Sequence, residues 1–160
     1  MLAGMHELGR LAGYFAAHQI RNIRNLSDGE TLFPMLGYEH ADHGRGATCF
    51  VGEIGRDVLT ANEHGAQRAV FVVDGYVTLD AGKFDALIIE AVEYGPGEAS
   101  LTIAVPYRPP ASPGGFAVHR PKFFQLTGVD RAGLGEAFLA GVDSHHQAAA
   151  VWHTHLDDSV

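Results

Sequence analysis

The sequence predicts an α+β fold, in which one antiparallel sheet has N-terminal and C-terminal helices packed on one face. The first observation is a series of three runs rich in Val, Ile, Phe and Tyr, at residues 68–79, 84–94 and 99–107. The second is that residues 80–83 and 95–98, which separate them, have tight turn compositions. Antiparallel strands can be joined by such turns, whereas parallel strands need long crossovers. The runs therefore predict a three-stranded meander at the centre of a sheet of five to six strands.

The third observation is an apolar stripe at helical spacing near each end of the chain. The first stripe predicts a helix over residues 5–25, which Ser27, Asp28 and Gly29 then break. The second predicts one helix over residues 131–156, with Asp130 as its N-cap. Its apolar positions, three and four residues apart, are Leu134, Phe138, Val142, His145, Ala149, Trp152 and Leu156.

The remaining elements are shorter. Residues 31–40 and 47–53 read as extended segments that pair with each other, and residues 57–65 as a short helix. Residues 116–126 read as a further strand, which Pro121 breaks and so places at an edge of the sheet. A boundary in the Pro/Gly-rich stretch 106–115 would leave only about 45 residues after it, few for a core of their own. We therefore expect residues 1–160 to form a single α+β domain.

Composition narrows the class of protein. The chain has 160 residues and a net charge of −8, which disfavours nucleic acid and anionic membranes as partners. There is no basic, apolar leader and no run approaching the ~20 apolar residues that span a bilayer. The single cysteine, Cys49, lies in an apolar strand and is expected to be a buried, inert thiol. These features predict a cytoplasmic protein.

Ten histidines raise the question of a metal site. Glu39, His40 and His43 carry side chains that bind zinc or iron, but alternation along an extended chain points His40 away from the other two. His153 and His155, two residues apart on a helix, lie on different faces. The expectation is therefore no metal and no cofactor, with a metal-binding protein through Glu39, His40 and His43 as a weak alternative.

No motif points to a particular catalytic chemistry. The chain has neither a G-x-G-x-x-G nor a P-loop, and Ser112 lacks the context of a nucleophile elbow. Glu90 interrupts an apolar strand face shared with Ile88 and Val92. A carboxylate at such a place needs a partner or a raised pKa, and a salt bridge is the simpler expectation. Whether the chain is an enzyme is left open by the sequence.

The most informative stretch of the sequence stands out by its charge pattern. No Asp or Glu occurs between Glu98 and Asp130, and this interval holds a Pro/Gly-rich loop with bases and aromatic residues. Such a loop could bind a carboxylate or phosphate group. The predicted ligand-binding residues are Tyr107, Arg108, His119, Arg120 and Lys122. In the competing interpretation, the loop is solvated and its bases pair with acidic residues elsewhere.

These observations predict a small acidic binding or interaction module that is not an enzyme. The expected partners are a second copy of the chain, which would form a homodimer, and another protein or a small anionic ligand. The alternative is a small enzyme or anionic-ligand-binding protein that uses the loop from Arg108 to Lys122, with His119 as its acid or base. In overall plan alone, the chain is similar to type III secretion chaperones and related bacterial binding modules.

Overall fold

The computed structural model describes residues 2–52, 54–95 and 98–160, with side chains from residue 7 onward. Its helices are α1 (Leu2–Arg24), α2 (Asp57–Ala61), α3 (Leu134–Ser144) and α4 (His146–His155). Its strands are β1 (Met35–Glu39), β2 (Arg45–Cys49), β3 (Arg68–Leu79), β4 (Gly82–Glu93), β5 (Ala99–Arg108), β6 (Ala117–Val118) and β7 (Lys122–Thr127). Among the described helices, none combines the length and apolar character that crossing a bilayer requires.

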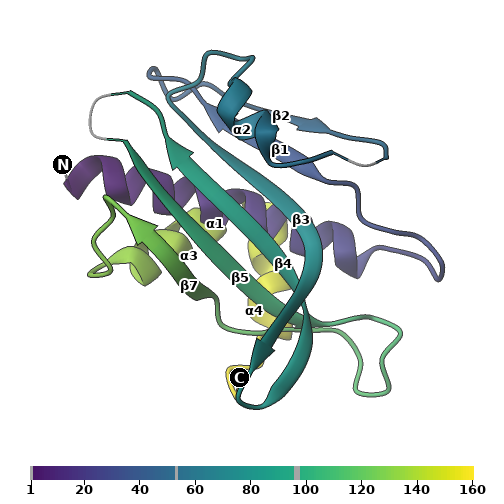
Figure 1. Cartoon of the computed structure of the whole chain (residues 1–160). Coiled ribbons are helices and arrows are strands. Elements are labelled where there is room, and N and C mark those ends of the chain that lie inside the picture. The colour runs from purple at the N-terminus through teal and green to yellow at the C-terminus, as the bar shows by residue number, and fades with distance from the viewer. Residues whose placement is uncertain (1, 53, 96–97) are drawn as a thin grey trace.

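The strands form one antiparallel sheet in the order β2-β1-β3-β4-β5-β6, with β7 also paired to β5 (Figure 1). The predicted meander is confirmed, because β3, β4 and β5 are sequential antiparallel neighbours with unbroken register from Arg68↔Glu93 to Leu79↔Gly82. Of the predicted turn at 95–98, residues 96 and 97 lie outside the described residues, as does residue 53 at the end of the predicted segment 47–53.

The strand predicted over residues 116–126 is two strands rather than one. β6 pairs with Tyr107 and Arg108 at one end of β5, and β7 pairs with Ser100 to Ala104 at the other end. Pro121, which has no N–H to donate, separates them. Both occupy the edge of the sheet, as predicted, so the sheet is six strands wide although seven strands contribute to it.

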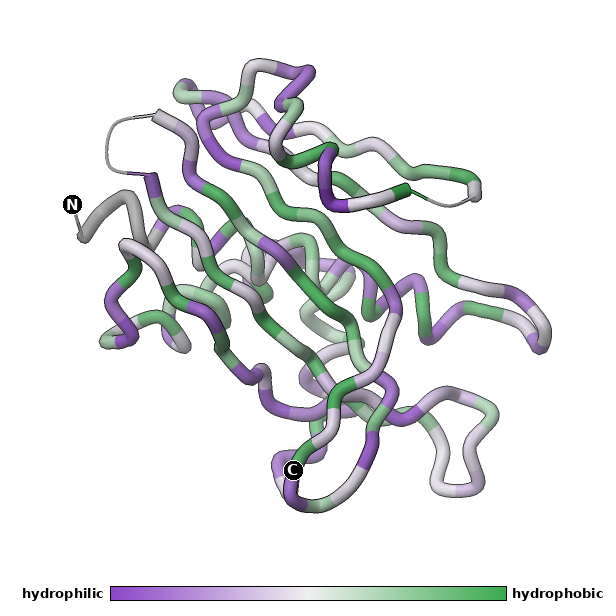
Figure 2. Tube along the Cα trace, in the orientation of Figure 1, coloured by the Kyte–Doolittle hydropathy of each residue, from purple (hydrophilic) through white to green (hydrophobic). Residues whose placement is uncertain are grey.

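The long helices cover one face of the sheet, as Figure 1 shows. Along β5, Leu101, Ile103 and Val105 are buried on this face, alternating with Ser100 and Thr102 on the other. The green segments of β3 to β5 in Figure 2 mark the apolar strands that form the centre of the sheet. The main core therefore lies between α1, α3, α4 and one face of the sheet.

Two glycines allow α1 and α3 to touch through their backbones. A Cβ atom at Gly13 would lie 1.9 Å from the Phe138 carbonyl oxygen, and one at Gly141 would lie 2.0 Å from that of Arg10. Any side chain at either position would push the helices apart, because the obstructing atoms belong to the main chain.

The C-terminal helix is not continuous, contrary to prediction. It breaks at His145 (φ −96°, ψ 87°), whose Nδ1 accepts a hydrogen bond from the Ala148 N–H and so caps α4. The other ring nitrogen lies 2.9 Å from His18 Nδ1 on α1. Burial lowers the pKa of both histidines, which favours a neutral pair that shares one hydrogen bond. His145 thus ends one helix and begins the next.

The opposite face of the sheet has its own small core under α2. Leu36, Phe71 and Ala69 of β1 and β3 bury against Leu59 of α2. This cover extends over only part of the face, because α2 has five residues. The remainder of the face, over β4 and β5, lies open between α2 and β7.

Cys49 is exposed rather than buried, which corrects the sequence-based expectation. It belongs to β2, which pairs with β1 alone and so forms an edge of the sheet. A strand at an edge lacks the second neighbour that would enclose its side chains.

Candidate functional site

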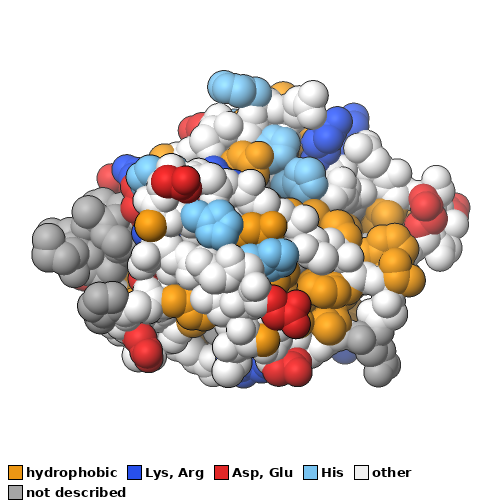
Figure 3. Space-filling view, turned by 90° about the horizontal axis from the view of Figure 1, so that it is seen from above, with side chains coloured by type: hydrophobic (Ala, Val, Ile, Leu, Met, Phe, Trp, Pro, Cys, Tyr) orange, Lys and Arg blue, Asp and Glu red, His pale blue; other side chains and the backbone are white. Residues whose placement is uncertain are grey.

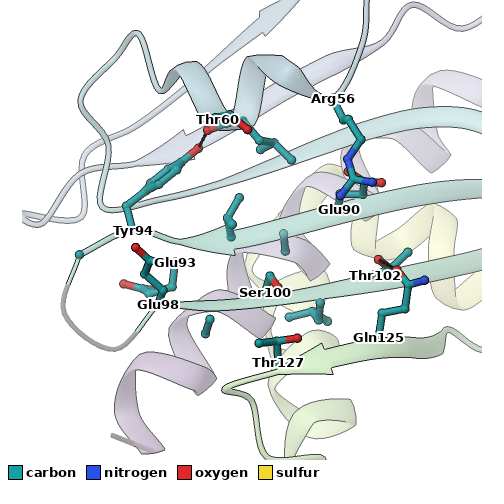
Figure 4. Close-up of a pocket in the computed structure, with 16 residues that line it drawn as sticks. Arg56, Thr60, Glu90, Glu93, Tyr94, Glu98, Ser100, Thr102, Gln125 and Thr127 are labelled. Carbon is teal, nitrogen blue, oxygen red and sulfur yellow. Dashed lines mark hydrogen bonds and ion pairs between the residues drawn. The ribbon is translucent and has the colours of Figure 1, made fainter.

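A groove of about 570 Å³ crosses the open face of the sheet (Figure 4). Its floor is formed by Glu90 and Val92 of β4 and by Ser100 and Thr102 of β5, which are cross-strand neighbours. One wall is α2 with the Arg56 side chain that precedes it, and the other is β7. The groove therefore lies over β4 and β5, each of which is hydrogen-bonded to a strand on both sides.

The wall formed by α2 is fixed by hydrogen bonds at both of its sides. The Tyr94 hydroxyl, at the end of β4, donates to the Leu59 carbonyl, and burial raises the pKa of Tyr94. The Asn62 side chain then closes the turn after α2, because it accepts from the Ala66 N–H and donates to the Ala66 carbonyl. Hydrogen bonds within the chain thus hold this wall in place.

The opposite wall owes its shape to a β-bulge. The register between β5 and β7 shifts between Ser100 and Thr102, and Gln125 has a φ of 50°, which is rare for residues other than glycine. The bulge brings the Gln125 amide over the groove, where its Oε1 accepts from the Thr102 hydroxyl at 3.2 Å. Bulges commonly redirect a side chain toward a site in this way.

Glu90 places a carboxylate on the floor of the groove, beside Arg56 (Figure 4). Arg56 Nε lies 3.0 Å from Glu90 Oε2, so the salt bridge expected for Glu90 is present. The approach does not meet hydrogen-bond geometry, however, and Oε2 is buried without a hydrogen-bond donor among the described residues. A buried carboxylate oxygen in this state is an unmet acceptor.

The five residues predicted to bind a ligand lie at the far end of β5 and after it, away from this groove. The Tyr107 hydroxyl donates to Asp74 Oδ1 at 2.6 Å, and burial with this bond raises the pKa of Tyr107. Arg108 donates to the carbonyls of Gly114 and Gly115 in its own loop. His119 is buried, with Nδ1 2.9 Å from the Asp157 carbonyl oxygen.

Arg120 and Lys122 complete the predicted set. Arg120 donates from Nε to the Val160 main-chain oxygen at 3.2 Å, and Lys122 begins β7. The polar contacts of Arg108, His119 and Arg120 thus go to main-chain oxygens and to the carboxylate of Asp157, whose Oδ2 lies 3.7 Å from Arg108 Nη1. An anion would have to compete with these partners, and the site remains a prediction.

The structure brings His43 near Glu39, as the weak metal alternative requires, and adds Glu7 as a third group. The ligand atoms of these three residues lie within 4.8 Å of one another. His40 instead packs edge-on against Tyr38, whose ring stacks on His64. Figure 3 shows how widely histidine side chains are spread over the face seen from above.

We expect purified protein to contain well under one equivalent of zinc or iron. Both carboxylate oxygens of Glu39 already face guanidinium groups, Oε2 that of Arg45 and Oε1 that of Arg68. A divalent cation would meet two fixed positive charges there. Elemental analysis of protein purified without chelator checks this. About one metal per chain, lost on His43→Ala, would contradict the expectation.

No protein family, curated protein or solved structure matches this chain in the comparisons made with it. The function is therefore inferred from the geometry of the groove. Sequence reasoning noted Glu90 as an interruption of an apolar face, but it missed Arg56, Thr60 and Gln125. The signal that could have found the groove is that Thr102 and Ser100 share the face of Glu90 in the predicted meander.

Proposed function

We propose that this chain is a non-enzymatic binding module and that the groove between α2 and β7 is its binding site. The observation that carries the proposal is the buried Glu90 Oε2, an acceptor without a donor at the floor of a preformed groove. Leaving such an atom unsatisfied is unfavourable, and a ligand that carries a hydrogen-bond donor would supply the missing bond.

The lining of the groove supports binding rather than nucleophilic catalysis. It offers the hydroxyls of Thr60, Ser100, Thr102 and Thr127 and the amide of Gln125, all suited to orienting a polar ligand. Among the described residues that line it there is no histidine or cysteine. Covalent catalysis by one of these hydroxyls would require an adjacent base, and the Thr102 hydroxyl, opposite Glu90, donates instead to Gln125 Oε1.

A ligand screen with a blocked variant tests the proposal. We expect small molecules detected by ligand-observed NMR against the native chain to lose binding to Thr102→Trp, because an indole at this position fills the groove. Thr78→Trp, on an exposed position of β3, is the matched control. Hits that bind both variants equally would show that binding occurs elsewhere, for instance at Arg108 to Lys122. The homodimer stays a prediction, which the molecular mass in solution checks.

A further inference from the structure

Glu90 lies at the boundary between a polar and an apolar half of the open face. Its neighbours on the same face of β4 are Ile88 and Val92. A second hollow, lined by Val77, Ile88, Ala104 and Phe124, shares Thr102 and Gln125 with the groove. Phe124 is 39% exposed there. The two hollows therefore adjoin each other at Thr102 and Gln125, and a ligand held at Glu90 would have apolar surface beside it.

The charge of the polar half is negative. Three carboxylates line it, those of Glu90, Glu93 and Glu98, against the single guanidinium of Arg56. Glu93 is already neutralised by Arg68 Nε at 2.8 Å and accepts from Gln67 as well. Glu90 and Glu98 therefore leave a negative balance for a ligand to meet. Across the apolar half, Arg131 lies at the rim and donates to the Phe123 carbonyl.

The ion pair with Arg56 shows that Glu90 binds a cationic group. A cation on a ligand could take the place of Arg56. Its guanidinium reaches the carboxylate from the α2 side of the groove, as Figure 4 shows, yet its side chain is 78% exposed whereas that of Glu90 is 23% exposed. Exposed ion pairs contribute little to stability. Displacing Arg56 by a ligand cation would therefore cost little stability. The ligand would in turn form a hydrogen bond to Oε2 that Arg56 does not make.

We propose that the groove takes a small organic cation with an apolar body, namely a primary amine or guanidinium carried on an aliphatic or aromatic group. The ammonium or guanidinium group donates to Glu90 Oε2, and the apolar body lies over Ile88 and Phe124. Charge-assisted hydrogen bonds of this kind are among the stronger polar contacts. This inference rests on the proposed function, since it assigns a ligand class to the same groove.

Three probes separate charge from shape in isothermal titration calorimetry. Phenethylammonium has both features, 3-phenylpropanoate keeps the apolar body with the opposite charge, and ethylammonium keeps the charge with little body. We expect phenethylammonium to bind at least tenfold more tightly than either of the others. Glu90→Gln should weaken it at least tenfold, and Arg56→Gln should strengthen it. Glu136→Gln, an exposed carboxylate on α3, is the matched control and should change nothing.

The outcomes test the ligand class separately from the location of the binding site. If 3-phenylpropanoate binds as well as phenethylammonium, or if binding needs Arg56, the ligand class is wrong. In that case the groove still stands as the site when Thr102→Trp abolishes the binding. If Thr102→Trp leaves the binding of every probe and every screening hit unchanged, the groove itself is wrong. Should Glu90→Gln fail to fold, the Arg56→Gln comparison still decides, because an unchanged or weaker amine affinity overturns the inference.

Discussion

Replacing Arg68 by Ala should lower the free energy of unfolding by about 3–5 kcal/mol, because it removes the cation shared by the buried carboxylate of Glu39 and the largely buried carboxylate of Glu93. Arg68 is 7% exposed, and it ion-pairs with Glu39 on β1 and with Glu93 on β4, its cross-strand neighbours on both sides. Burial alone would lower the pKa of Arg68, but its hydrogen bonds to Glu93 and Glu39 outweigh it, and the pKa is raised. The pairs thus join three adjacent strands.

Urea denaturation followed by circular dichroism measures this loss. Arg45→Ala is the matched control, because Arg45 also pairs with Glu39 but is 28% exposed, and the expected loss is about 1 kcal/mol or less. Adding Glu39→Gln and Glu93→Gln to an Arg68→Met chain should recover much of the stability, since no charge is then left buried alone. A loss below about 1 kcal/mol for Arg68→Ala would show that water reaches both carboxylates.

The meander could be predicted because the sequence patterns that specify it lie within short segments. Alternation at Leu101, Ile103 and Val105 defines the buried face, and short turn compositions leave antiparallel pairing as the simple solution. The break at His145 could not be predicted in this way. The apolar stripe continues through it, and one of the two hydrogen bonds of the His145 ring is with His18, 127 residues away in the chain.

The site was harder to predict than the fold, for a similar reason. An interval without acids drew attention to Arg108 and Arg120, but a charge pattern does not reveal where each guanidinium finds its partner. The groove depends on α2 and β7 lying on either side of Glu90, and on a bulge that turns Gln125 inward. Neither arrangement is encoded in a short segment.

Replacing Trp152 by Ala should also cost about 3–5 kcal/mol of stability, because the indole is fully buried. Its ring centroid lies 5.8 Å from that of Phe138, which in turn meets Phe123 of β7 at 5.9 Å. Trp152 therefore connects α4 to α3 and, through Phe138, to the edge of the sheet. Removing it leaves a cavity among residues that α1 and the strands hold in place, so collapse around the gap is limited.

Trp152→Phe separates the packing of the ring from the bonding of its nitrogen. The indole Nε1 is buried without a hydrogen-bond partner among the described residues, so a phenyl ring loses no polar contact there. We expect this variant to lose clearly less than Trp152→Ala, and Leu139→Ala, at a 42% exposed position on α3, to lose under about 1 kcal/mol. Because Trp152 is the chain's single tryptophan, unfolding must be followed by circular dichroism rather than by fluorescence. Equal losses for the Ala and Phe variants would mean that the specific shape of the indole, rather than the volume it fills, holds α4 against α3.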